Sequence, residues 1–544
     1  MNQSTLMRSC GGCIRPIDSV EKIRRGQPHV VCNGNTTEKD SQGKAYGLDG
    51  PLVLPMATLS GLLSQPIEAV EAVHDLLDTE MLVRTPGRSL VNQKANHFGP
   101  FSMTVPEEDS VAGETWTMTV QCDDAIRGGS ECPSSYFVHL RGPTLVTISP
   151  RMEIYHHDAD TGCTEIPITV PQAGQYEVWV WPEWANTGEC PADQGETFGH
   201  RPAVRGSGET VVRVSPGKPV VDHVEDCKSG EYESDLPGRW VSIAHINSRY
   251  RDAHWVQSHI ARSTYGSPLA DSLNGGMPDY IYLPYRCKRP ALDYAWLVGE
   301  TKSMRHVFYI GDSILRTTFC SHLQNELLGG ITGDCMYSDD LKGYHLSAKS
   351  FTYDLPPDDP RGHVRFSQRF IAQDINAVKE VDGLHDYPEP VTHVIVNIGM
   401  WYGYDTPDEY ASKVNIVLEQ VLESFGQHVS ITWLHSVSVS PPIFCYNFIK
   451  RLHLRQQGDY AKMTINAFRD RHPTIDVREV DTFPIVDARP ETSSDGRHWV
   501  QEGDLPDLAE RPMVGRADHA VMEIVYSAWL EDYLDRLRWG DVSV

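Results

Sequence analysis

A serine lies where an apolar segment of the chain stops and a helical pattern begins. The apolar segment is 306–310, and Gly311, Asp312 and Ser313 follow it directly. A serine hydroxyl attacks a carbonyl carbon only when a base removes its proton, and a turn between a buried strand and a helix presents the side chain beside backbone N–H groups. Those N–H groups can stabilise an oxyanion. Ser313 is therefore a candidate nucleophile.

A base and an acid for this serine occur near the end of the sequence. His498 offers an imidazole, and Asp495 precedes it by three residues, so one ring nitrogen can meet the carboxylate while the other faces Ser313. The order of the three residues along the chain is immaterial, because such a set is defined by geometry. His519 is the alternative base, but its acidic neighbour Asp518 is adjacent, and adjacent side chains diverge more often than they pair. We predict Ser313, Asp495 and His498 as the catalytic set.

The elements that must position these residues follow the rhythm of a doubly wound parallel sheet. Continuous apolar runs suit parallel strands that are covered on both faces, and helical periodicity separates them. Strands are expected at 307–310, 393–398, 429–434 and 475–480, and helices at 314–328, 414–425, 460–471 and 520–537. In open α/β sheets the functional residues come from strand ends. We therefore predict an α/β catalytic domain over 223–544.

An earlier part of the chain, 96–222, has the period-two alternation of an antiparallel β-sandwich. The clearest strands are expected at 115–120, 136–140 and 175–181. Trp179 and Trp181 share one face of the last strand and, with Trp184, could stack on a sugar, although alternating aromatics in a strand more often pack within a sandwich. The structure of residues 1–95 is left open.

Two histidines in this part were considered as metal ligands. His156, His157 and Asp158 are consecutive, and consecutive side chains of a strand point to opposite faces. A solvated turn is therefore favoured over a metal site.

The segments around the candidate residues resemble the PC-esterase branch of the GDSL or SGNH hydrolase superfamily. That branch includes trichome-birefringence-like glycan O-acetyltransferases, Cas-type sialate O-acetyltransferases and the C-terminal domains of NXPE proteins. The resemblance rests on 311–313 followed by Arg316, on 397–401, and on 495–498, and it covers roughly 225 to 540. Residues 238–241 and Cys287 also resemble the family's entry segment.

The resemblance implies an SGNH-type sheet with Ser313 as nucleophile, His498 as general base and Asp495 as its orienting acid. Asn397 and Gly399 are placed near the oxyanion pocket by the same likeness. The oxyanion glycine itself stays open, with Gly329, Gly330 and Gly333 as candidates beside the simpler role of glycines in loop geometry.

Two further side chains could touch the substrate. Arg316 lies one helical turn after Ser313 and could hold a carboxylate or polarise an acyl carbonyl, or it could secure the helix through a salt bridge. Trp401 could offer a face to a sugar, with core packing as the alternative.

The segment 173–178 resembles the late strand of filamin-type and other immunoglobulin-like modules, and NXPE proteins also place a β-module before the esterase domain. The expected architecture is therefore an immunoglobulin/filamin-like sandwich followed by an SGNH-type domain.

The expected function is serine-dependent acyl ester chemistry on a glycan, as a carbohydrate O-acetyltransferase or an O-acetylesterase. No cofactor is required, apart from an acetyl donor if the enzyme is a transferase. The alternative is a secreted or surface binding protein that uses the sandwich on an esterase-like scaffold, because fold alone does not guarantee activity. A lipid or small-ester hydrolase predicts an apolar acyl groove and ranks behind glycan acylation.

Composition limits the partners. The 544 residues include 48 basic and 74 acidic ones, and the resulting net charge of −26 argues against nucleic acid and anionic membranes. No apolar run approaches the roughly 20 residues that a transmembrane helix needs. No apolar core of a signal peptide is visible near the N-terminus, whereas the resemblance implies the Golgi lumen or the extracellular space.

Cysteines allow two further expectations. The twelve cysteines are spread in a way that favours disulfides over metal clusters. A zinc site made of Cys10, Cys13, His29 and Cys32 is a weaker alternative to a disulfide or free thiols in that segment.

Overall fold

The fold is of mixed α/β class, as expected, and several of its sheets contain parallel strand pairs. The computed structural model describes residues 7–10, 13–16, 38–39, 45–46, 98–106, 110–122, 135–148, 156–158, 161–183, 197–198, 203–217, 238–246, 250, 252–264, 280–284, 294–317, 319, 323, 327, 349–371, 388–403, 405–441, 444–445, 451–490, 497 and 521. The first four strands form two short antiparallel pairs, β1 (Met7–Cys10) with β2 (Cys13–Pro16) and β3 (Glu38–Lys39) with β4 (Ala45–Tyr46).

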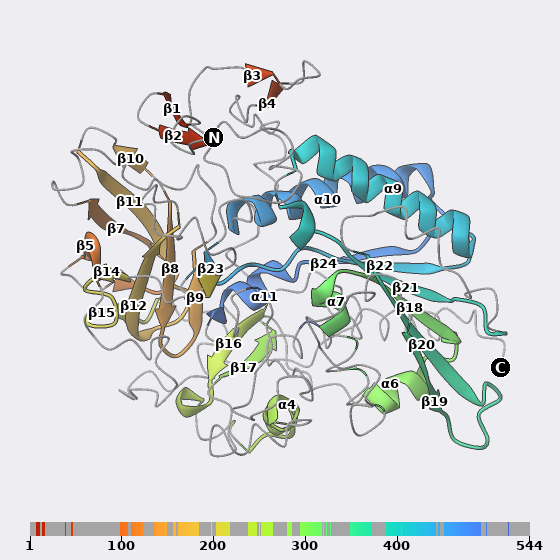
Figure 1. Cartoon of the computed structure of the whole chain (residues 1–544). Helices are drawn as coiled ribbons and strands as arrows, with labels where there is room; N and C mark the ends of the chain where they lie inside the picture. Colours follow the sequence, from red (N-terminus) through yellow and green to blue (C-terminus); the bar gives the residue numbers. More distant parts are fainter. Residues whose placement is uncertain are drawn as a thin grey trace.

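Two five-stranded sheets share one hydrophobic core, and we call them the two-sheet unit (Figure 1). The first sheet has the order β10 (His156–Asp158), β11 (Cys163–Thr169), β7 (Thr115–Cys122), β5 (Phe98–Thr104) and β14 (Ala203–Arg205). The second has the order β6 (Ser110–Val111), β15 (Val211–Ser215), β12 (Gly174–Pro182), β8 (Tyr136–Arg141) and β9 (Leu145–Thr147). Most pairs are antiparallel, but β14 with β5 and β15 with β6 are parallel.

The core of the two-sheet unit follows from alternation along its strands. Met118 and Val120 of β7 point inward, and Tyr176, Val178 and Val180 of β12 face them from the other sheet. These side chains are removed from water on both sheets, which is the main stabilising contribution in a sandwich of this size.

The outward face of β12 is covered only at its end, at Trp181. Trp179 and Trp181 lie on one face, as predicted, with their rings stacked at 5.5 Å, and Trp181 is 0% exposed against Phe137. At Trp181 the structure therefore supports packing within the protein and not a surface on which a sugar stacks. Trp184 lies outside the described residues.

A six-stranded sheet forms the second large part of the molecule. Its order is β19 (Lys349–Asp354), β20 (His363–Phe370), β18 (His306–Gly311), β21 (His393–Asn397), β22 (Ser430–Leu434) and β24 (Val477–Val480). All neighbours are parallel except β19 with β20. The second parallel strand along the chain, β20, lies on one side of β18 and all later ones lie on the other, so the strand order reverses at β18.

Helices cover both faces of this sheet, which explains the uninterrupted burial of β18 and β21 (Figure 1). One face packs against α9 (Pro407–Phe425) and α10 (Arg451–Arg471). The other packs against α6 (Tyr294–Glu300), α7 (Ser313–Thr317) and α11 (Phe483–Asp487).

A smaller layer lies beside both parts. It contains β16 (Gly238–Ser242) paired with β17 (Tyr280–Pro284), the short helix η4 (Ile243–His245) and α4 (His254–Thr264). Ser242 N–H donates to Pro143 O, and Tyr280 Oη donates to Gly142 O. The strands β13 (Thr197–Phe198) and β23 (Phe444–Cys445) form a separate antiparallel pair, which joins the segment after β12 to the segment after β22. None of the helices in the described blocks is both long and apolar enough to cross a bilayer.

Three sequence predictions need correction, and one is the helix expected over 414–425, which begins earlier, at Pro407, after the cap residue Thr406. His156–Asp158 form the edge strand β10 and not a solvated turn; the turn comes just after it, where Asp158 accepts from Thr161 Oγ1. The helix expected over 460–471 begins at Arg451, because its polar first turns are buried by partners distant in sequence.

Candidate active site

Four of the candidate residues, Ser313, Asn397, Gly399 and Trp401, lie at the carboxyl edge of the six-stranded sheet, where the strand order reverses. Gly311, the last residue of β18, is in register with Asn397, the last residue of β21. Ser313 and the segment 397–401 therefore leave neighbouring strands at the same edge. In open α/β sheets this is the position at which ligands bind.

The turn at Ser313 is fixed by its two preceding residues. Asp312 caps α7, because its Oδ1 accepts from Ile314 N–H at 2.9 Å and its backbone oxygen accepts from Arg316 N–H at 3.1 Å. A Cβ on Gly311 would lie 2.5 Å from Asn397 O and 2.8 Å from Leu315 Cδ2, so only glycine allows the strand and helix to approach this closely. Ser313 is consequently the first residue of α7 and is 9% exposed.

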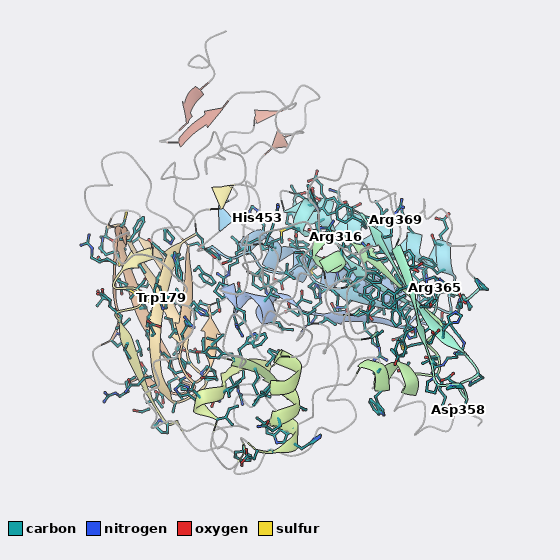
Figure 2. The ribbon with its side chains drawn as sticks, turned by 60° about the horizontal axis from the view of Figure 1, so that its bottom comes forward. Trp179, Arg316, Asp358, Arg365, Arg369 and His453 are labelled. Carbon is teal, nitrogen blue, oxygen red and sulfur yellow. The ribbon has the colours of Figure 1, made fainter. Side chains whose placement is uncertain are left out.

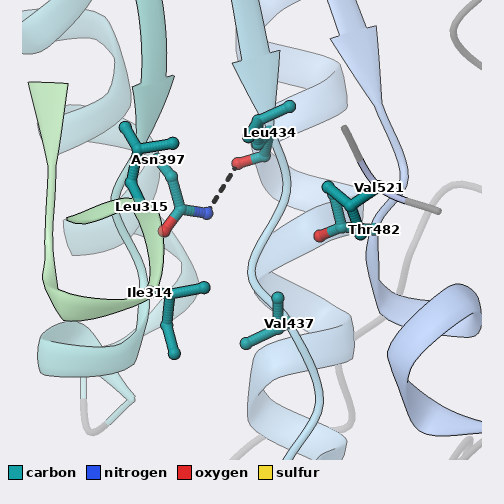
Figure 3. A pocket seen from close by; sticks show the side chains of 7 residues that line it. All are labelled: Ile314, Leu315, Asn397, Leu434, Val437, Thr482 and Val521. Atoms are coloured by element: carbon teal, nitrogen blue, oxygen red, sulfur yellow. Dashed lines mark hydrogen bonds between the residues drawn. The ribbon is translucent and has the colours of Figure 1, made fainter. Parts of the chain in front are cut away.

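The side chain of Asn397 links the end of β21 to the end of β22 through its amide group. Its Nδ2 donates to Leu434 O at 3.0 Å (Figure 3). The same nitrogen donates to His435 O at 3.1 Å. Both partners are carbonyl oxygens, which accept only, so the amide nitrogen must face them. The amide nitrogen of Asn397 is therefore turned toward the backbone after β22 in this structure.

A small cavity lies between α7 and the end of β22. It is lined by Ile314, Leu315, Asn397, Leu434, Val437, Thr482 and Val521 (Figure 3). Its volume of about 10 Å³ has room for about one water molecule. Thr482 Oγ1 donates to His435 O, so the polar side chains of the lining are committed to the backbone and the cavity is mainly apolar. It is too small for a long acyl chain.

The helix η10 (Met400–Tyr402) presents Trp401 at this edge, and its backbone is held from behind. Trp401 is 36% exposed, so it is not a core residue. Tyr410 Oη donates to Ile398 O at 2.6 Å, and Gln457 Nε2 donates to Tyr402 O at 2.6 Å. His453 Nδ1 lies 3.1 Å from Gly403 O. The support comes mainly from α10, and the sequence analysis missed it because it began that helix after Gln457.

Gly399 is required for packing. A Cβ at this position would lie 1.8 Å from Ser436 Oγ, which follows β22. Ser436 in turn donates to Gln457 Oε1 at 3.3 Å. Gly399 therefore brings the η10 segment against the end of β22, and its expected part in the oxyanion pocket stays a prediction.

Arg316 lies on α7, one turn after Ser313, and its guanidinium carbon is 5.4 Å from the centre of the Phe370 ring. The side chain is buried at the end of β20. Figure 2 shows Arg316 in the six-stranded part, well apart from Trp179 in the two-sheet unit. Its expected contact with substrate stays a prediction.

The predicted base and acid, His498 and Asp495, lie outside the described residues, as do His519 and the three candidate glycines Gly329, Gly330 and Gly333. One buried histidine with an acidic partner lies close in the sheet: His435 Nε2 is 3.0 Å from Glu479 Oε2. A Cβ on Gly458 of α10 would be 3.8 Å from His435 Nδ1, so this ring faces α10 and not α7.

Glu479 interacts with His435 and with Arg469 of α10, on the side of the sheet away from α7. Burial raises the pKa of Glu479, but the hydrogen bond from His435 and the charges of His435 and Arg469 outweigh it and lower the pKa below its ordinary value. The His435–Glu479 pair therefore links the end of β22 to β24 and α10. It is not placed to act as a base for Ser313.

Metal ligands do not gather in the described part of the chain. No group of three or more His, Cys, Asp or Glu side chains there is placed to hold a metal ion. Of the alternative zinc ligands, Cys10 and Cys13 face each other in the register of the β1/β2 hairpin, and His29 and Cys32 lie outside the described residues. Cys122 is disulfide-bonded, whereas Cys163 is a free thiol.

Comparisons with known proteins give no family. No family model matches the chain, and no curated protein matches it. Among solved structures, one similar chain is 12% identical, covers 42% of this chain and 99% of its own length, and has a TM-score of 0.23. A likeness this weak carries no argument about fold or function.

Proposed function

We propose that the chain is a serine-dependent acyl ester enzyme that acts on glycans, as a carbohydrate O-acetyltransferase or O-acetylesterase. The observation that carries the proposal is the position of Ser313. It follows the strand at which the order of the sheet reverses, and the segment with Trp401 follows the neighbouring strand. The parallel strand order is compatible with the SGNH-type domain that the sequence resembles.

In the proposed reaction, His498 removes the proton of Ser313 Oγ as that oxygen attacks the carbonyl carbon of an acetyl ester. Backbone N–H groups stabilise the oxyanion, and the protonated imidazole gives its proton to the leaving alkoxide. The acetyl group then stays on Ser313 until water or a sugar hydroxyl, deprotonated by His498, attacks it. Asp495 holds the imidazole in the required tautomer.

The committed amide of Asn397 bears on how the oxyanion is stabilised. If the side chain keeps both bonds to the end of β22, backbone N–H groups must do this without it. The cavity beside α7 has room for about one water molecule, so it cannot hold a long acyl chain and gives no support to a lipid hydrolase. The exposed ring of Trp401 offers a face for a sugar.

We further propose that the two-sheet unit is an immunoglobulin-like or filamin-like module. Tyr176 lies near the start of β12, and its hydroxyl donates to Gln172 O, four residues earlier, at 3.1 Å. Bonds of this kind are typical of immunoglobulin-like sandwiches. The disulfide at Cys122 supports residence in an oxidising compartment such as the secretory lumen or the extracellular space.

The test uses purified full-length protein with p-nitrophenyl acetate and acetylated glycans. Wild type is expected to release acetate and to gain the mass of one acetyl group on Ser313, whereas Ser313→Ala and His498→Ala do neither. Adding candidate acceptor sugars then separates transfer from hydrolysis. Wild type that is inert with every donor would contradict the proposal.

One observation favours a second function, a glycan-binding or protein-binding protein on an esterase-like scaffold. The Asn397 amide already spends its donors on the backbone, as it would in a sheet that no longer catalyses. Binding of glycans by wild type and by Ser313→Ala with equal affinity, and without acetate release, would support it.

A further inference from the structure

A buried arginine connects the two-sheet unit to the carboxyl edge. Arg451, the first residue of α10, is 2% exposed. Its Nε and Nη2 donate to the two oxygens of Asp487 at 2.6 and 2.7 Å, and its Nη1 donates to Glu183 Oε1 at 2.8 Å. Nη2 also donates to Ile148 O. The guanidinium lies over Phe137, with its carbon 4.6 Å from the ring centre.

The partners of Arg451 come from both parts of the molecule. Glu183 and Ile148 belong to the two-sheet unit, whereas Asp487 ends α11. Glu183 is itself oriented by Ser135, whose Oγ donates to Oε2 at 2.6 Å. A guanidinium with a bidentate carboxylate on one side and a second carboxylate on the other has little freedom to rotate. The junction is therefore fixed in direction as well as in distance.

Two connections lead from this junction to the candidate site. The first runs along α10, whose next two turns carry His453 and Gln457, the residues that bind Gly403 O and Tyr402 O behind Trp401. A shift of Arg451 along or about the helix axis would move these supports with it.

The second connection runs through α11. Asp487 O accepts from Thr147 Oγ1, Ile485 O accepts from Trp240 Nε1 at 2.7 Å, and Pro490 O accepts from Ser440 Oγ at 3.1 Å. Asp495 follows Pro490 by only five residues, which span at most about 18 Å. The fixed end of this segment thus limits where the proposed acid and base can lie.

We propose that Glu183 and Arg451 are positioning residues, through which the two-sheet unit sets the geometry of the carboxyl edge. The pair touches no substrate; it acts through η10 on one side and through the 483–490 segment on the other. The inference rests on the proposed function where it concerns catalysis, but the mechanical coupling can be measured without any activity.

The experiment compares Glu183→Gln and Arg451→Lys with a matched control, Arg361→Lys, in the full chain. Arg361 is also a buried arginine with a carboxylate and backbone carbonyl partners, Asp359 Oδ2 at 2.6 Å and Thr301 O at 2.7 Å. It lies in the connection between β19 and β20 and also donates to Val298 O and Gly299 O of α6. These elements lie apart from the two-sheet unit (Figure 1). Each protein is assayed for thermal unfolding, hydrogen exchange in 398–405 and 483–490, and acetyl ester turnover.

All three variants are expected to unfold at lower temperature than wild type. Only the two junction variants should exchange several-fold faster in both segments. They should also lose roughly 10- to 100-fold in kcat, with KM nearly unchanged, because small displacements of reacting groups are costly. Glu183→Asp keeps the charge and should recover part of the loss. If Arg451→Lys does not fold, the comparison of Glu183→Gln with Glu183→Asp still tests the proposal.

The outcomes separate the two proposals. If the junction variants match the control in exchange and in kcat, Arg451 only stabilises the fold and the positioning role is wrong. If wild type is inert but the junction variants exchange faster in both segments, the coupling stands and the proposed function fails.

Discussion

The junction at Arg451 and the carboxyl edge at Ser313 are both built from polar residues, but they use them in opposite ways. At the junction every named charge has an opposite partner within 3 Å and little access to water. At the edge, the Asn397 amide is turned toward the backbone, Ser313 is buried, and Trp401 is 36% exposed. Pairing of charges therefore marks the scaffold here, whereas the candidate site is marked by its place at the ends of neighbouring strands.

The largest effect of a substitution at either region is expected at Ser313. Replacing it by alanine should lower acetyl ester turnover by roughly 10⁴-fold or more, since the nucleophile of a Ser-His-Asp set acts together with its partners. The midpoint of thermal unfolding should stay close to that of wild type, because only a small polar group is removed. Equal turnover by wild type and Ser313→Ala would place the chemistry elsewhere.

At Trp181 we expect the opposite, a large loss of stability and no direct effect on turnover. Trp181 packs against Phe137, the ring on which Arg451 lies. Trp181→Ala removes a fully buried ring that packs against Phe137 and Trp179, and should lower the free energy of unfolding by about 3–5 kcal/mol. Urea unfolding measures this loss. A near-neutral change, together with weaker glycan binding, would mean that the tryptophan pair serves a ligand after all.

The third effect separates the pH dependence of the scaffold from that of the site. Burial lowers the pKa of His306 from 6.5 to about 4, and its Nε2 lies 2.7 Å from Ser367 Oγ. Below pH 6.5 the unfolded chain gains a proton that the folded chain refuses, so stability should fall as the pH drops from 6.5 to 4, by about 3 kcal/mol in total.

Unfolding free energies at several pH values test this slope. His306→Gln should flatten it, because it removes the group that titrates differently in the folded and unfolded chains. Any loss of turnover that remains below pH 6.5 in His306→Gln would then belong to the site. A slope that is the same in His306→Gln and wild type would show that His306 is not its source.

The smallest effect is expected at Trp401. Its ring is 36% exposed, so Trp401→Ala should lower the free energy of unfolding by about 1–2 kcal/mol, less than at Trp181. If the ring stacks on a sugar, KM for an acetylated oligosaccharide should rise roughly 10-fold while turnover of p-nitrophenyl acetate is kept. Trp401→Phe, which retains a ring face, is the matched control. An unchanged KM in both variants would remove Trp401 from the substrate site.

The sequence was most informative where burial is local and regular. β18, β21 and β12 were predicted because their apolar runs or alternation need no knowledge of partners, and Ser313 was found because it follows such a run. The first turns of α10 were missed because Arg451, His453 and Gln457 look like solvated residues. Only partners distant in the sequence, such as Glu183 and Tyr402, bury them.

Roles that depend on hydrogen-bond direction could not be predicted either. Asn397 was correctly placed at the strand end, but whether its amide faces the backbone or the solvent depends on the carbonyls at the end of β22, some 37 residues away. For the same reason, the sequence analysis placed a turn at His156–Asp158, where pairing with β11 makes a strand.

The central place of β18 has a consequence for synthesis. It is the first parallel strand of its sheet to leave the ribosome, yet its neighbours β20 and β21 end at Phe370 and Asn397. Until those segments emerge, the nascent chain holds an apolar strand with two unpaired edges, and such segments are prone to aggregate. Ser313 can therefore reach its final surroundings only late, after a folding step dominated by contacts between distant parts of the chain.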